Sequence, residues 1–229
     1  MKKVFEYFTK FEWFLYTFSL IAVIVGFFVF DRHNYLFLVI SIVGVFYLAF
    51  CAKGKPVGQL LVIAFSILYG IVSYYASYYG EMITYIGMTG SLAVISLIVW
   101  LNNPTSKKDN TVKINKLSTR EWLALLLISG IVSVMFYFIL KMLHNENLVM
   151  STLSVTTSFL ASYLSLRRSK YYAIAYALND VILIILWAML SPNNVKYINL
   201  VICFAVFLVN DVYGFIAWHK RDLATKDFE

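Results

Sequence analysis

Two Asn-Asp pairs lie inside long apolar stretches of the chain, Asn179-Asp180 and Asn210-Asp211. An amide group both donates and accepts hydrogen bonds, and a carboxyl group accepts them or, when protonated, donates one. Polar side chains inside apolar segments of membrane length are costly, and they mark functional sites by default. The two pairs are therefore the first candidates for a binding site.

Side chains at helical spacing from these pairs extend the candidate site. Residues three, four or seven positions apart share one face of a helix. The candidates added by position and residue type are Tyr172, Tyr176 and Trp187 around the first pair, Tyr213 beside the second, and Gln59, Ser66 and Tyr69 within the stretch 59–79. Because aromatic faces stack on flat rings and amides bind hydroxyl groups, this lining predicts a neutral or cationic ring that carries hydroxyls, such as a nucleoside or a vitamin.

A purely structural interpretation of the Asn-Asp pairs stays open. Asn and Asp side chains can bond across a contact between two membrane helices, and this could explain Asn179 and Asn210. Asp180 and Asp211 are harder to explain in this way because an unpaired carboxylate in lipid is expensive. These carboxyl groups would have to be protonated, paired across the bundle, or exposed to a wet cavity.

The composition places the candidates in a membrane protein. Hydrophobic residues make up 61% of the chain and charged residues 14%, and the mean hydropathy is +0.77. Soluble domains carry about 25% charged residues. Apolar runs long enough to cross a bilayer lie at 13–30, 35–52, 59–79, 82–101, 121–140, 148–166, 171–190 and 197–218. We therefore expect an all-α integral membrane protein with eight transmembrane helices.

The basic residues predict how these helices are oriented. The net charge is +7, but Lys and Arg cluster at the ends of apolar runs, which argues against nucleic-acid binding. With eight spans, sixteen of the 19 Lys and Arg residues fall on one side, and only Arg32, Lys141 and Lys196 fall on the other. The positive-inside rule then places both termini in the cytoplasm.

The longest polar stretch, 102–120, divides the chain into similar halves. Each half contains three apolar runs in similar order, and a basic loop separates the first run from the second. The second runs contain related tripeptides, Ile63-Ala64-Phe65 and Ile174-Ala175-Tyr176, and the third runs end at Trp100 and Trp218. This pattern predicts two parallel three-helix repeats joined by a connector helix, a 3+1+3 arrangement. The expected units are an interfacial segment with an extra first helix at 1–34, a first repeat at 35–101, a loop and connector helix at 102–147, a second repeat at 148–219, and a cytoplasmic tail at 220–229.

Signals of enzymes and cofactors are absent from the sequence. No metalloprotease motif, nucleophile elbow or nucleotide-binding loop occurs. Cys51 and Cys203 lie in or beside apolar runs, and two such thiols form neither a disulfide framework nor a metal-ligand set. We therefore expect no catalytic residues, no metal and no cofactor.

Several short motifs carry a resemblance to a known family. They are Asn179, the run from Asn210 to Trp218, Ile67-Leu68-Tyr69-Gly70, Tyr79-Gly80-Glu81, and Arg167-Arg168. In these motifs the chain resembles the PnuC family of nicotinamide riboside transporters, which resemble full-length SWEET proteins in their 3+1+3 helices. The chain departs from the family at Ala175 and Tyr172, where tryptophans are common, and at Ser66 and Ala93, where Asn is frequent.

The resemblance implies a function and a site. It implies uptake of nicotinamide riboside or a related nucleoside or vitamin by facilitated diffusion, with trapping by a cytosolic kinase, in a homotrimer of the bacterial cytoplasmic membrane. Asn179, Asn210 and Tyr213 would contact the substrate, with Trp187 and Trp218 as neighbours. The departures leave thiamine, riboflavin and deoxynucleosides open as substrates, and proton coupling through Asp180 or Asp211 is a further alternative. A membrane-embedded enzyme or structural subunit is the interpretation from another class.

Overall fold

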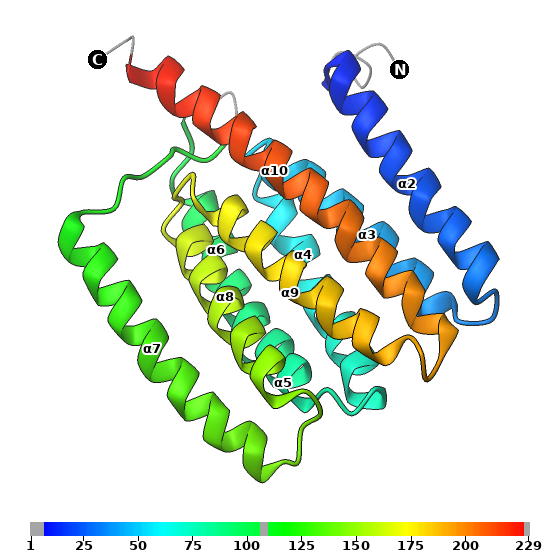
Figure 1. Ribbon diagram of the computed structural model, residues 1–229. Coiled ribbons are helices and arrows are strands. Elements are labelled where there is room, and N and C mark those ends of the chain that lie inside the picture. Colours follow the sequence, from blue (N-terminus) through cyan, green and yellow to red (C-terminus); the bar gives the residue numbers. More distant parts are fainter. Residues whose placement is uncertain (1–6, 106–109, 227–229) are drawn as a thin grey trace.

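The computed structural model describes residues 7–105 and 110–226, and in this part of the chain all regular elements are helices (Figure 1). Eight helices there are long and apolar enough to cross a membrane, which confirms the predicted fold class. They are α2 (Lys10–Phe30), α3 (Tyr35–Ala52), α4 (Val57–Tyr75), a continuous span of α5 (Tyr79–Met82), η1 (Ile83–Thr89) and α6 (Gly90–Leu101), then α7 (Thr119–Met142), α8 (Leu148–Leu166), α9 (Tyr172–Leu190), and α10 (Ile198–Lys226) after the short turn η2 (Val195–Tyr197).

Some of the basic residues counted in the sequence lie outside the described residues, namely Lys2, Lys3, Lys107 and Lys108.

One boundary differs from the prediction, because α10 continues through most of the expected tail to Lys226. This extension is held by an ion pair, in which Lys170 Nζ lies 2.7 Å from an Asp222 carboxyl oxygen. A polar helical segment can therefore continue beyond the apolar span.

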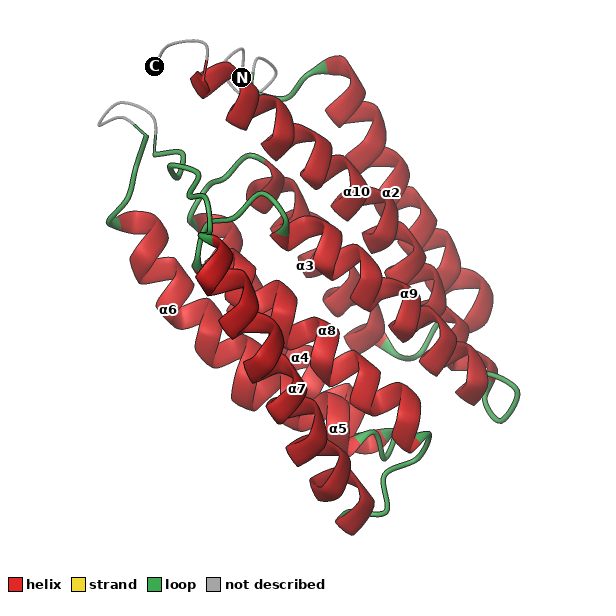
Figure 2. Cartoon of the chain, turned by 60° about the vertical axis from the view of Figure 1, so that its left-hand side comes forward, coloured by secondary structure: helices red, strands yellow, loops and turns green. Residues whose placement is uncertain are grey.

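Six of the helices form a closed ring. Around it, α3 packs on α4, α4 on α6, α6 on α8, α8 on α9, α9 on α10, and α10 on α3. The connector α7 packs outside this ring against α8, and α2 packs outside it against α10 and α3; the two stand on opposite sides of the bundle (Figures 1 and 2). The first triplet is thus α3, α4 and α5–η1–α6, and the second is α8, α9 and α10.

The first helix of each triplet ends in the same kind of turn. After α3, Gly54 has a φ of 68° and its N–H donates to the Cys51 carbonyl at 2.8 Å. After α8, Arg168 has a φ of 56° and its N–H donates to the Ser165 carbonyl at 2.9 Å. Glycine adopts this left-handed conformation readily, whereas a residue with a side chain does so rarely. The shared turn supports the predicted repeat.

Two tryptophans join the triplets at the end of the bundle where α2 begins and α10 ends, called here the terminal end. Trp100 Nε1 on α6 donates to the Ser165 carbonyl of α8 at 3.0 Å, and Trp218 Nε1 on α10 donates to the Cys51 carbonyl of α3 at 2.9 Å. Their ring centroids are 5.5 Å apart and both side chains are buried. Each triplet therefore donates a hydrogen bond to the other at this end.

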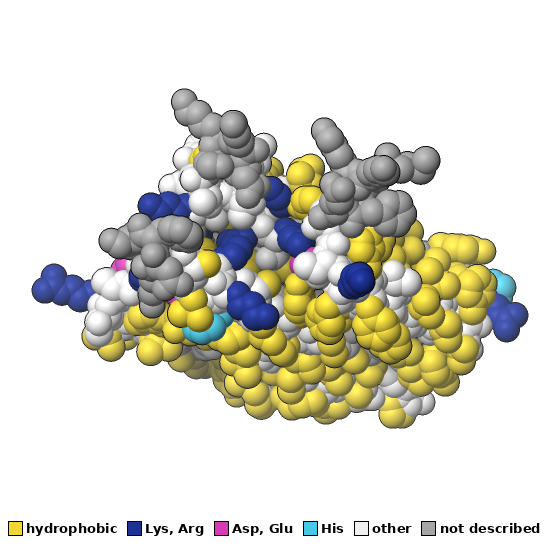
Figure 3. Space-filling model, turned by 90° about the horizontal axis from the view of Figure 1, so that it is seen from above, with side chains coloured by type: hydrophobic (Ala, Val, Ile, Leu, Met, Phe, Trp, Pro, Cys, Tyr) yellow, Lys and Arg dark blue, Asp and Glu magenta, His cyan; other side chains and the backbone are white. Residues whose placement is uncertain are grey.

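Charged side chains also gather at the terminal end. Figure 3 views the molecule from that end. Lys and Arg side chains lie around the centre of this view, and the visible flanks of the molecule are mostly apolar. Large apolar side chains on the outside of the helices, among them Phe14, Leu60, Leu127 and Val209, are exposed. Such a surface fits a bilayer, which solvates apolar side chains as readily as a protein interior does.

The contact between α3 and α10 depends on Gly44, and this generates a stability prediction. A Cβ added there would lie 1.8 Å from Cζ of Phe207. Gly44→Ala should therefore lower the melting temperature in detergent by several degrees, because overpacking costs about 1–3 kcal/mol and each kcal/mol shifts the midpoint by about 2–4 °C.

Gly130 on α7 provides the matched control. An added Cβ at Gly130 meets no described atom within 4 Å. Gly130→Ala should leave the melting temperature unchanged or raise it slightly, since Ala favours helix over Gly. Equal destabilisation by both substitutions would contradict the close contact between α3 and α10.

Candidate substrate site

A polar cluster around Asn179 joins the second triplet to the first. Asn179 is 1% exposed, and its Oδ1 accepts hydrogen bonds from Thr157 at 2.8 Å, Ser158 at 3.1 Å and Ser154 at 3.3 Å on α8. Its Nδ2 donates to the Tyr85 hydroxyl of η1 at 3.1 Å. A buried amide that bonds to groups on two other elements is held in one orientation. A ligand hydroxyl could replace any of these hydroxyl partners.

Aromatic rings fill the space beside this cluster. The Tyr85 ring lies 4.4 Å from the Tyr69 ring, which stacks on Phe65 at 5.6 Å. Phe65 in turn contacts Tyr47 at 5.2 Å and Phe207 at 5.5 Å. These rings come from α3, α4, η1 and α10, so both triplets supply them. One of these rings, Tyr69, is a site candidate predicted from the sequence.

The end of the ring opposite the terminal end is closed by hydrogen-bonded aromatic side chains. Trp187 Nε1 donates to the Tyr69 hydroxyl at 2.8 Å, and the Trp187 ring lies 5.1 Å from that of Tyr78. The Tyr78 hydroxyl donates to the Leu186 carbonyl at 2.9 Å. Trp187 therefore positions Tyr69 and packs above the polar cluster.

A buried carboxyl group precedes the π-helix that positions Tyr85. Glu81 is fully buried, and its Oε2 accepts a hydrogen bond from Ser154 Oγ at 3.1 Å. The single proton of Ser154 is therefore shared between this oxygen and Asn179 Oδ1. Oε1 of Glu81 has no hydrogen-bond partner among the described residues. The π-helix Ile83–Thr89 shifts the register of the span, as such segments do at many functional sites. Sequence reasoning missed Tyr85 because α-helical periodicity does not reveal a π-helix; Glu81, a charge in an apolar run, was the available signal.

Asp180 and Asp211 form a pair between neighbouring helices. They are 4% and 3% exposed, and their side chains are within hydrogen-bonding reach of one another. Electrostatic interactions connect them with the hydroxyl groups of Tyr47, Tyr85 and Tyr176. The two carboxyl groups therefore meet between neighbouring helices of the second triplet.

Asn210 and Tyr213 lie against the extra helix α2 and not in the ring interior. Asn210 Nδ2 donates to Ser19 Oγ at 2.9 Å, and the Tyr213 hydroxyl donates to Glu12 Oε1 at 2.7 Å. Glu12 also pairs with Lys53 at 2.7 Å. The structure therefore separates Asn210 from Asp211, because consecutive residues on a helix point about 100° apart.

The remaining candidates are spread along the ring. Tyr176 shares a 3.1 Å hydrogen bond with Ser162, near the acid pair. Tyr172 packs 4.9 Å from the Trp218 ring, and Gln59 Nε2 donates to Ser165 Oγ at 3.0 Å, so both close the terminal end. The Ser66 hydroxyl is buried without a hydrogen-bond partner in the described part of the chain.

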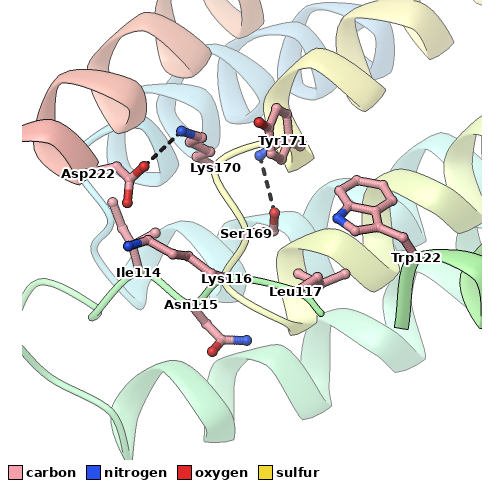
Figure 4. A pocket seen from close by; sticks show the side chains of 9 residues that line it. All are labelled: Ile114, Asn115, Lys116, Leu117, Trp122, Ser169, Lys170, Tyr171 and Asp222. Carbon is pink, nitrogen blue, oxygen red and sulfur yellow. Dashed lines mark hydrogen bonds and ion pairs between the residues drawn. The ribbon is translucent and has the colours of Figure 1, made fainter. Parts of the chain in front are cut away.

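A cavity at the terminal end was not anticipated from the sequence. It has a volume of about 240 Å³ and is lined by Ile114, Asn115, Lys116, Leu117, Trp122, Ser169, Lys170, Tyr171 and Asp222 (Figure 4). Most of these residues come from the loop before α7 and the turn before α9. The pair of Lys170 and Asp222 forms one side of it. The cavity lies beyond Tyr172 and is separate from the polar cluster at Asn179.

Comparisons with known proteins agree with this arrangement. The sequence pattern of the nicotinamide mononucleotide transporter family matches residues 34–220. The chain is 27% identical over 228 residues to the nicotinamide riboside transporter PnuC of Neisseria mucosa, covering 96% of this chain and 84% of the relative. A crystal structure of the vitamin B3 transporter PnuC superposes with a TM-score of 0.81 at 25% identity, covering 93% of this chain and 92% of the other. The chain therefore belongs to the nicotinamide mononucleotide transporter family, and it is a multi-pass membrane transporter of a small molecule and not an enzyme.

Proposed function

We propose that the chain takes up nicotinamide riboside, or a related nucleoside or vitamin, by facilitated diffusion with alternating access. The observation that carries this proposal is the buried amide of Asn179 beside the rings of Tyr69 and Tyr85 in the centre of the ring. An amide among hydroxyl groups suits ribose hydroxyls or a carboxamide, and neighbouring rings suit a flat base. The names of the relatives point to the same class of substrate.

Within this proposal the predicted site residues divide into two groups. Asn179, Asp180, Tyr69 and Tyr176 line the ring interior and contact the substrate. Trp187 holds Tyr69, and the other candidates hold helices in place. Asn210 and Tyr213 bond to α2, and Gln59 and Tyr172 contact side chains at the terminal end. Ser66 packs beside Gly90, where an added Cβ would lie 3.5 Å from the Ser66 Cβ.

Alternating access follows from where the two triplets meet. At the terminal end the triplets are joined by Trp100 and Trp218, and at the opposite end by the bond of Trp187 to Tyr69. Opening one end requires its bonds to break while those at the other end hold. We infer that the triplets rock about the central cluster, as in transporters built from repeats.

The cellular setting belongs to the same proposal. The charge asymmetry supports a bacterial cytoplasmic membrane with both termini in the cytoplasm, where a kinase would trap the substrate by phosphorylation. A homotrimer is what the family resemblance implies, and α7, which packs on α8 outside the ring, is where neighbouring copies would meet. Native mass spectrometry of the detergent-solubilised protein measures this state directly.

Uptake into proteoliposomes tests the function. Labelled nicotinamide riboside should accumulate only to the external concentration, without an ion or pH gradient, because facilitated diffusion equalises concentrations. Empty liposomes are the control, and unlabelled thiamine, riboflavin and deoxynucleosides serve as competitors. Accumulation that requires a pH gradient would favour the proton-coupled alternative, and uptake equal to that of empty liposomes would reject nicotinamide riboside as the substrate.

Two asparagines on different faces give a matched pair of variants. Asn179→Ala should weaken substrate binding about tenfold or more, since it leaves buried hydroxyl groups unpaired. Asn210→Ala should lower the melting temperature through α2 while changing affinity less than about threefold. Isothermal titration and thermal melting of both variants make the comparison. The reverse result would place the site at α2.

Cysteine labelling tests the orientation. The two native cysteines are buried, so a membrane-impermeant maleimide should label introduced thiols selectively. In intact cells, Asn193→Cys should react and Lys113→Cys should react only after permeabilisation. Both positions are exposed. The opposite pattern would invert the proposed topology.

A further inference from the structure

The Asp180–Asp211 pair has no positive partner in its surroundings. The carboxyl groups lie on α9 and α10 in the middle of the ring, and in the described part of the chain no Lys or Arg contributes to the electrostatic environment of either group. The ion pairs formed by Lys53, Arg167 and Lys170 lie at the terminal end, with Glu12, Glu121 and Asp222. Among the described residues, no Lys or Arg is therefore placed to balance a negative charge on this pair.

The hydrogen bond between the carboxyl groups limits how much charge they carry. Two carboxyl groups bond to each other only when at least one holds a proton, because a carboxylate is an acceptor without a donor. The pair therefore carries at most one negative charge, and a positively charged group beside it favours the form that carries this charge. Oδ2 of each residue has no hydrogen-bond partner among the described residues, so one acceptor on each side is left available.

Aromatic side chains around the pair also favour a positive ligand. Tyr47, Tyr85 and Tyr176 interact electrostatically with the carboxyl groups, and Tyr47 packs between Phe65 and Phe207. The faces of aromatic rings attract cations, and the attraction is stronger where water is excluded. The three tyrosines that interact with the pair come from α3, η1 and α9, so they approach it from different helices.

We propose that Asp180 and Asp211 together determine the charge specificity of the central site, selecting a substrate whose ring carries a permanent positive charge. The inference rests on the proposed function and makes it more specific. Asn179 binds the hydroxyl or carboxamide groups, whereas the acid pair balances the charge of a pyridinium or thiazolium ring. A positively charged ring stabilises one carboxylate of the pair, whereas an uncharged ring of the same shape offers no such stabilisation.

Two ligands that differ mainly in charge test the proposal on the unmodified protein. Nicotinamide riboside carries a pyridinium cation, and dihydronicotinamide riboside, which has gained a hydride, is neutral. The purified protein should bind the cation about tenfold more tightly or better, measured by isothermal titration or by competition in uptake. Equal affinity for the two ribosides would overturn the proposal.

Substitutions then test whether the preference depends on the charge of the pair or on one particular aspartate. Asn resembles the protonated member of the pair, so Asp180→Asn and Asp211→Asn alone should each keep the preference within about threefold, as either change retains one carboxylate. The double variant should lose the preference, because it has no carboxyl group left in the pair, so the ratio of the two affinities should approach one. Preference retained in the double variant, or lost fully in a single variant, would contradict the shared charge.

Asp222→Asn is the matched control, because Asp222 is another buried acid on α10 but lies at the terminal end with Lys170. It should leave the ratio of the two affinities unchanged. Gel filtration and melting curves show whether each variant is folded, and the ratio for the unmodified protein tests the proposal without any variant.

The outcomes distinguish this inference from the proposed function. If neither riboside binds, the ratio is measured with thiamine, a thiazolium cation, and its neutral oxidation product thiochrome, and the cation should again be preferred. Binding without a charge preference, or selective binding of riboflavin or an uncharged deoxynucleoside, would overturn the proposed role of the acid pair but not the proposed transport function. Absence of binding by all of these ligands counts against the proposed function.

Discussion

In a bilayer, a polar group that faces the lipid finds no water to bond with, so pairing such groups inside the protein lowers the free energy. Around Asn179 this constraint brings together three hydroxyl groups of α8 and the hydroxyl of Tyr85. The same constraint directs the indole N–H groups of Trp100 and Trp218 onto carbonyls of the opposite triplet. The ring of six helices is held together largely where such groups meet.

The pairing of polar groups also separates two tasks on a single helix. On α10, Asp211 faces Asp180 in the interior, whereas Asn210 and Tyr213 face Ser19 and Glu12 of α2. One face of the helix can therefore serve the transported molecule while the other keeps the extra helix in place. Substitutions on the inner face should therefore change substrate binding, whereas substitutions on the outer face should change stability.

Much of the fold follows from local properties of the sequence. The lengths of the apolar runs and the spacing of the basic loops predicted eight helices and the 3+1+3 arrangement, and the structure has both. The π-helix that positions Tyr85 could not be predicted, because its register shift depends on packing against α4 and α8 and not on local periodicity. The extension of α10 to Lys226 was missed for a related reason, since its ion pair with Lys170 joins residues distant in the sequence.

The sequence by itself determined the solvent of this protein, the number of its membrane helices and the depth of its polar residues, because hydropathy and charge act along the chain without reference to other segments. Only the tertiary structure decided which of those residues face one another. Asn179 and Asn210 are alike in type and both lie inside apolar runs, yet one meets Tyr85 in the ring and the other meets Ser19 on α2. The direction of a side chain depends on the rotation of its helix about its own axis, and packing between helices sets that rotation.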